Sequence, residues 1–138
     1  MKTMSWVLLG VVASATLVLS LVSASVAYRG GNERIGPVGL TDLAAGRQEV
    51  LTALKARRAT AAAYAAGFAT LFLAVTLGPY RRGDAWAWWA LLAATLVYGG
   101  VSLLRVPLLA TQLGAGPAGI QVGIVIVALL LDVRRLRS

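Results

Sequence analysis

The segment from residue 6 to residue 27 contains no charged side chain. A helix of this length, about 22 residues at 1.5 Å each, can cross a hydrocarbon core of roughly 30 Å. A secretory signal peptide is the alternative, because Lys2 precedes the segment and Ser25-Val26-Ala27 resembles a cleavage site. The segment is longer than the roughly 7–15 apolar residues of a signal peptide, so we expect a retained transmembrane helix.

The composition of the whole chain agrees with a membrane location. Of its 138 residues, 59% are apolar and 13% are charged, whereas soluble domains have about 45–50% and about 25%. The net charge is +8, and the basic residues flank apolar segments, where they would face the membrane surface. We therefore predict one integral membrane domain over residues 1–138, in the cell membrane, whose partner is the lipid bilayer and not nucleic acid.

Two missing residue types exclude several kinds of chemistry. The chain has no cysteine and no histidine, which excludes thiol catalysis, disulfides, thiolate or imidazole metal sites, Ser-His triads and histidine-ligated haem. The sequence also contains no phosphate loop and no dinucleotide fingerprint. We expect no metal and no cofactor.

Residues 28–58 form the one substantial polar segment. Its first half is rich in Gly and Pro and predicts an irregular loop, while Thr41 as N-cap predicts an amphipathic helix over residues 41–58. One face of that helix would hold Leu43, Arg47, Val50, Leu51, Leu54 and Arg58. The two arginines on this face are expected to reach headgroup phosphates. Alternatively, Arg47 turns into the bundle and binds an anionic group.

The second predicted span covers residues 59–78 and is rich in alanine. Ala59, Ala63 and Gly67 recur at four-residue spacing, and small residues at this spacing let helix backbones approach closely within a membrane. This face predicts packing, either inside the subunit or against another protein or a second copy of the chain.

A turn is predicted at residues 79–84, where Gly78 and Pro79 would end the second helix and Asp84 would cap the next. Paired arginines and closely spaced tryptophans are typical of a membrane surface, so we expect interface anchors here. Stacking of the tryptophans on a ligand is the alternative. The expected anchors are Arg81, Arg82, Trp86, Trp88 and Trp89.

The third and fourth predicted spans cover residues 85–105 and 118–132. The fourth is short for a bilayer, and residues 106–113 between them are apolar and contain Pro107. We predict that the third helix kinks or breaks near Pro107, so that residues 106–113 fold along the outer leaflet. Gly119 and Gly123 add a second helix-contact signal.

These segments predict an all-α fold: a four-helix transmembrane bundle with an amphipathic helix in its first extramembrane loop and a break near Pro107. Four spans place both termini on one side. Basic residues of short segments weigh most in the positive-inside rule, and the Arg81-Arg82 turn and the Arg134-Arg135-Arg137 tail are such segments. We expect both termini in the cytoplasm.

Candidate ligand-binding residues lie mostly near the outer end of the last two spans. An arginine and two amides beside interrupted backbone could hold a lipid headgroup, a quinone carbonyl or a carboxylate. Alternatively, Arg105 reaches the membrane surface and the amides satisfy freed carbonyls. The candidates are Arg105, Thr111, Gln112 and Gln121, with Arg47, Tyr64 and Tyr98 as further ligand contacts.

The sequence 79–89, Pro-Tyr-Arg-Arg-Gly-Asp-Ala-Trp-Ala-Trp-Trp, resembles a turn in small four-helix bacterial membrane proteins that are similar in size and layout to the DoxX-like group. The resemblance covers about a third of the chain. It implies a four-helix membrane architecture and supplies no catalytic residue.

The expected function is that of a non-enzymatic accessory or scaffold subunit that acts through helix packing. No acidic residue is placed as an isolated charge at mid-membrane, which argues against proton-coupled transport and acid-base catalysis. The alternative is a protein that binds or converts a lipid, quinone or terpenoid in a pocket in the outer half of the bundle. A minimal transporter is a third possibility.

Overall fold

The computed structural model describes residues 2–29, 34–35, 37–110 and 115–133. This part of the chain is built from five α-helices, one π-helical turn and one pair of two-residue strands. The all-α prediction is confirmed. Three helices, Met4–Arg29, Gln48–Tyr80 and Ala85–Leu109, are long and apolar enough to cross a membrane, and a fourth apolar helix, Ala115–Leu131, is shorter.

Helix α1 (Lys2–Arg29) is uninterrupted over 28 residues. It contains the predicted span 6–27 and adds about one turn at its start. Neither Gly nor Pro occurs between Gly10 and the end of the helix, so no residue in this stretch breaks the backbone hydrogen-bond ladder.

The segment after α1 contains a small hairpin and a short helix. Strand β1 (Arg34–Ile35) pairs antiparallel with β2 (Val38–Gly39), with Arg34 opposite Gly39. Helix α2 (Leu40–Ala44) follows directly and has only five residues. Ala45 and Gly46 then adopt positive φ values of 47° and 76°, which end the helix.

The predicted amphipathic helix over residues 41–58 is therefore wrong as a separate element. Its first residues belong to α2, and the rest belongs to α3 (Gln48–Val75), which also contains most of the predicted second span. Residues 48–66 contain no Gly or Pro, so nothing in the backbone chemistry separates a polar helix from an apolar one. The continuous helix Gln48–Tyr80 has 33 residues and is about 50 Å long, well beyond the roughly 30 Å of a hydrocarbon core.

The end of this helix also differs from the prediction. Gly78 and Pro79 do not stop it, because residues Thr76–Tyr80 form a π-helical turn, η1. Pro79 has no N–H to donate, and the wider turn lets the N–H of Arg81 reach the carbonyl oxygen of Thr76. The reversal follows at Gly83, whose φ is 105°.

Helix α4 (Ala85–Leu109) includes Pro107. The predicted break near Pro107 is displaced to Ala110, which adopts φ 49° and ends the helix. Helix α5 (Ala115–Leu131) begins three residues before the predicted position, with Pro117 in its first turn, where a missing N–H is tolerated. Thr111 and Gln112 lie outside the described residues.

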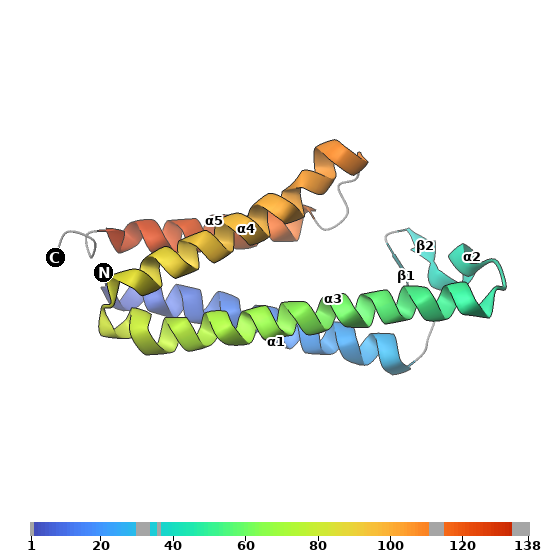
Figure 1. The fold of residues 1–138 in the computed structure, drawn as a ribbon, viewed down its shortest axis with the longest axis horizontal. Coiled ribbons are helices and arrows are strands. Elements are labelled where there is room, and N and C mark those ends of the chain that lie inside the picture. The colour runs from blue at the N-terminus through green and yellow to red at the C-terminus, as the bar shows by residue number, and fades with distance from the viewer. Residues whose placement is uncertain (1, 30–33, 36, 111–114, 134–138) are drawn as a thin grey trace. The chain divides into compact units, whose positions relative to one another are not determined.

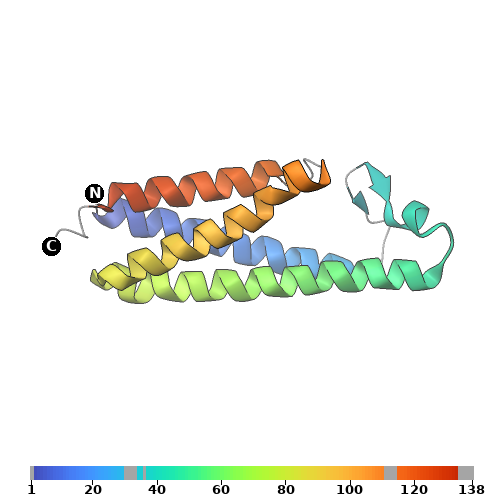
Figure 2. The ribbon, with the colours of Figure 1, turned by 45° about the horizontal axis from the view of Figure 1, so that its top comes forward.

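The chain divides into two compact units, each of which we describe separately. The first contains the start of α1, the end of α3, η1, α4 and α5, and its buried side chains include Leu9, Leu91 and Leu129. In this unit the start of α1, the turn before α4 and the end of α5 lie together (Figures 1 and 2). The second unit, residues 15–70, contains the rest of α1 and α3, joined by a 3.3 Å hydrogen bond from Arg58 Nε to Ser23 Oγ.

Candidate functional site

The first unit contains a buried chain of hydrogen bonds that joins three elements. Ser5 Oγ lies 2.5 Å from the hydroxyl oxygen of Tyr80 and 2.7 Å from the carbonyl oxygen of Ala128. A carbonyl only accepts, so the single Ser5 hydroxyl hydrogen goes to Ala128 and Tyr80 donates to Ser5. Ser5 and Tyr80 are both fully buried. These hydrogen bonds hold together the start of α1, the end of η1 and the last turns of α5.

Trp88 adds a second link at the same end of the unit. Its indole Nε1 donates to the carbonyl oxygen of Leu129 at 3.0 Å, and the side chain is only 6% exposed. Its ring also meets the ring of Trp89 edge to face, with 4.9 Å between centroids. The predicted place of Trp88 among the exposed interface anchors is therefore corrected: it is a core residue that ties α4 to α5.

Thr76 and Asp132 complete this buried cluster, which we call the polar end cluster (Ser5, Thr76, Tyr80, Trp88 and Asp132). The Thr76 hydroxyl donates to the carbonyl oxygen of Phe72 at 2.8 Å, within its own helix. Asp132, just beyond α5, is 4% exposed and is the one buried acid among the described residues. The arginines that the sequence places beside it, Arg134, Arg135 and Arg137, lie outside the described residues.

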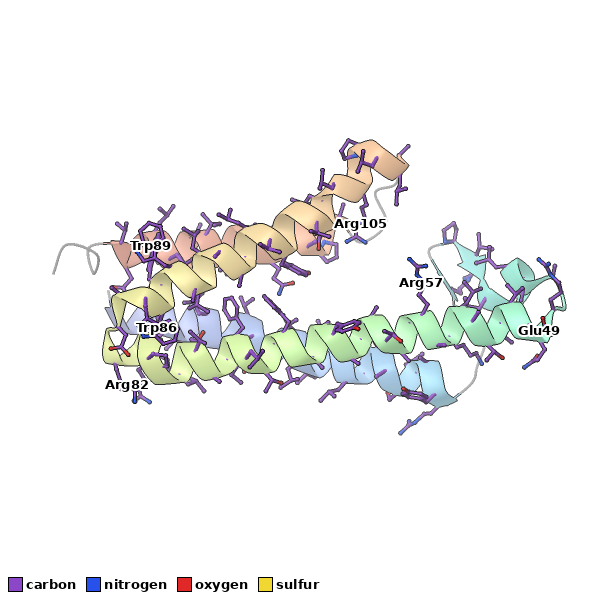
Figure 3. The ribbon with its side chains drawn as sticks, viewed as in Figure 1. Glu49, Arg57, Arg82, Trp86, Trp89 and Arg105 are labelled. Carbon is purple, nitrogen blue, oxygen red and sulfur yellow. The ribbon has the colours of Figure 1, made fainter. Side chains whose placement is uncertain are left out.

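The arginine turn lies next to this cluster. Arg81 Cζ is 4.8 Å from the centroid of the Trp6 ring, a distance suited to a cation–π interaction. Arg82, Trp86 and Trp89 are exposed, the two tryptophans by 58% and 57%. Figure 3 shows Arg82 directed away from the helices and the two tryptophans on the helix that follows. Asp84 occupies the N-cap position of α4, but its side chain forms no cap hydrogen bond, contrary to the prediction.

The predicted ligand residues near the other end of α4 are only partly brought together. The Tyr98 hydroxyl donates to Gln121 Oε1 at 3.2 Å, and Arg105 Nε donates to the Ser102 carbonyl at 2.7 Å. All three named side chains are half-buried. Arg105 thus forms a hydrogen bond within its own helix, and Tyr98 and Gln121 form one with each other. These three predicted ligand contacts therefore have partners inside the protein.

The remaining candidates, Arg47 and Tyr64, are exposed. Arg47 lies just before α3. Tyr64 is 77% exposed on α3. Arg58 is half-buried and bonds to Ser23, so the arginine that ties helices together is Arg58.

The glycines of the small-residue faces differ in how closely another part of the protein approaches them. An added Cβ at Gly99 would lie 2.9 Å from Val122 Cγ2, so Gly99 allows the close contact between α4 and α5. An added Cβ at Gly67, Gly119 or Gly123 would meet nothing within 4 Å. Ala59 is buried, whereas Ala63 is exposed. Most of the small-residue surface is therefore unused by the packing of the described chain.

The described residues contain no group of three or more acidic, His or Cys side chains that could hold a metal ion. Glu49 is exposed at the start of α3, and Glu33 lies outside the described residues.

The sequence did not indicate the polar end cluster. Ser5 precedes an apolar segment and Tyr80 lies inside a turn motif, and neither pattern says that the two residues meet. A signal for Trp88 was present: at 100° per residue, Trp86 and Trp89 share one helix face and Trp88 lies on another.

Comparison with protein-family models, curated proteins and solved structures finds no match for this chain. Its function has to be inferred from its own residues.

Proposed function

We propose that the protein is a small multi-pass membrane protein that acts as a non-enzymatic accessory or scaffold subunit through helix packing. Its helices expose many large apolar side chains, which would be unfavourable in water and favour lipid or another protein as their surroundings. Examples with more than half of their surface exposed are Leu19, Leu71, Val101 and Ile120, from four different helices.

The proposed architecture is a four-helix transmembrane bundle with both termini in the cytoplasm. Helix α5 has 17 residues and is about 25 Å long, somewhat short of a full span. However, its last turns contact residues near the start of α1 and α4, through Ser5 and Trp88. This contact supports a return of α5 to the side on which α1 begins. The basic turn at the same end supports a cytoplasmic location for that side.

The accessory function is supported by a difference between glycines of α4 and α5: some are needed for contact between these two helices, and others are not. Gly99 is used inside the subunit, where a side chain would clash with Val122. Gly119 and Gly123 are one turn apart on α5, and no atom within 4 Å would meet a Cβ there. Glycines at this spacing that serve no internal contact are suited to close approach by a helix of another chain.

The experiment replaces Gly119 and Gly123 by leucine in the full chain and follows association in a mild detergent. Because the chain has no cysteine, an introduced Ile120→Cys probes self-association by disulfide cross-linking, and co-purification detects a different protein partner. We expect the leucine variants to lose association. Gly100→Leu is the matched control, since an added Cβ at Gly100, as at Gly119 and Gly123, meets nothing within 4 Å. Unchanged association in the Gly119/Gly123 variants, or equal loss in the control, contradicts the proposal.

The alternative is a protein that binds or converts a lipophilic small molecule. Tyr98, Gln121 and Arg105 are its candidate contacts. The hydrogen bonds from Tyr98 to Gln121 and from Arg105 to Ser102 stay within the protein. Mass spectrometry of the purified protein separates the two functions: a small molecule that is lost in Arg105→Leu would favour the alternative.

A further inference from the structure

We infer that the turn at Arg81 and Arg82 is a binding site for the headgroup of an anionic phospholipid, in the leaflet next to the polar end cluster. This inference rests on the proposed membrane location of the chain. It goes beyond the proposed accessory function, because it assigns a specific ligand chemistry to one place on the surface.

The charge of the turn is the first argument. Arg81 and Arg82 are consecutive and exposed, and within the described residues neither forms an ion pair with an acid. Asp84, two residues further on, is half-buried and its side chain makes no cap bond. Guanidinium groups bind phosphate oxygens in pairs of hydrogen bonds. Two adjacent cations favour a lipid with a net negative charge over a zwitterionic one.

The rigidity of the turn is the second argument. Tyr80, directly before the arginines, is fully buried and hydrogen-bonded to Ser5. The N–H of Gly83 donates to the carbonyl oxygens of Pro79 and Tyr80 at 3.1 and 3.2 Å, which closes the backbone on itself. The Trp6 ring orients the Arg81 guanidinium at 4.8 Å. A cation that is held in place, as Arg81 is here, loses less conformational entropy when it binds an anion.

The two exposed tryptophans supply the third argument. Trp86 and Trp89 are three residues apart in the first turns of α4 and therefore lie on one helix face. Amphipathic indole rings are enriched at the level of lipid headgroups. Figure 3 shows both tryptophans on the helix that follows Arg82. They would place the arginine turn, which directly precedes them, at the depth of the lipid phosphates.

The test measures lipid binding by native mass spectrometry of the full chain in detergent, with phosphatidylglycerol and phosphatidylcholine as probes. We expect the wild type to prefer phosphatidylglycerol, and the double variant Arg81→Gln/Arg82→Gln to lose about tenfold in this preference. Trp6→Leu should lower the preference by a smaller factor. The matched control Arg34→Gln/Arg57→Gln removes two exposed charges elsewhere and should keep the preference.

Three results would overturn the inference: an unchanged preference in the Arg81/Arg82 variant, an equal loss in the Arg34/Arg57 control, or removal of the preference by millimolar inorganic phosphate, which would indicate a free-anion site. Circular dichroism of each variant verifies that the helices are intact. Association through Gly119 and Gly123 is measured separately, so failure of the lipid site and failure of the accessory function give different results.

Discussion

The indole N–H of Trp88 donates a hydrogen bond to the carbonyl oxygen of Leu129, 3.0 Å away, and thereby joins the first turns of α4 to the last turn of α5. Trp88→Phe keeps an aromatic ring and removes this donor. We expect the free energy of unfolding in detergent to fall by about 1–3 kcal/mol, from the lost buried hydrogen bond and some lost packing. Thermal unfolding followed by circular dichroism measures it. Trp86→Phe is the control, because its ring is exposed, and an equal loss in both variants would contradict the assigned role.

The Ser5–Tyr80 bond should appear as an energetic coupling. Ser5→Ala removes two hydrogen bonds, to Tyr80 and to Ala128, whereas Tyr80→Phe removes the one to Ser5. In a double-mutant cycle, we expect the combined variant to lose about 0.5–1.5 kcal/mol less stability than the sum of the single variants. Additive losses would mean that the two hydroxyl groups do not interact.

Gly99 and Gly100 form a matched pair for testing the contact between α4 and α5. Gly99→Ala places a methyl group against Val122, whose branched side chain has little freedom to move. We expect it to lower the free energy of unfolding by about 1–3 kcal/mol. Gly100→Ala brings the same gain in helix propensity without a clash, so it should be neutral or stabilising by up to about 1 kcal/mol. Partial rescue of Gly99→Ala by Val122→Ala would confirm the contact.

The proposed topology predicts opposite accessibility at two exposed sites. Single cysteines are introduced at Ala85, the first residue of α4, and at Leu43, in α2. The chain is otherwise free of cysteine. With a membrane-impermeant maleimide and intact cells, we expect labelling at residue 43 only. Labelling at residue 85 should require opened cells. The reversed pattern would place the termini outside, and equal labelling at both sites would exclude the four-span arrangement.

The helical class of the fold could be predicted from the sequence because apolar length is a strong signal. The helix boundaries could not be predicted equally well. The polar side chains of residues 48–58 predict a helix separate from the span that follows. Helix continuity, however, depends on the backbone, which has no Gly or Pro there. Pro79 was expected to end a helix, yet η1 accommodates it by widening one turn.

Only those parts of the candidate site whose residues are close together in the sequence could be predicted. Arg81, Arg82, Trp86 and Trp89 are neighbours in sequence, and the structure leaves all four exposed. The bond between Ser5 and Ala128 joins residues that are 123 positions apart. Such a contact depends on how the helices pack, and hydroxyl groups in apolar segments give no indication of their partners.

The π-helical turn at Thr76–Tyr80 contains one residue more than an α-helix needs to reach the same point along its axis. The π turn takes up this residue without turning the later residues to another face, because five residues of π-helix and about four residues of α-helix both complete little more than one rotation. Deleting Gly78 would let this stretch close into regular α-helix and would leave Tyr80 facing Ser5 and Arg81 facing Trp6. A deletion in the regular part of α3 has no such turn to absorb it and would rotate every later residue by about 100° around the helix axis. The direction of the arginine charges is thus tolerant of a one-residue change within η1 and sensitive to the same change in α3.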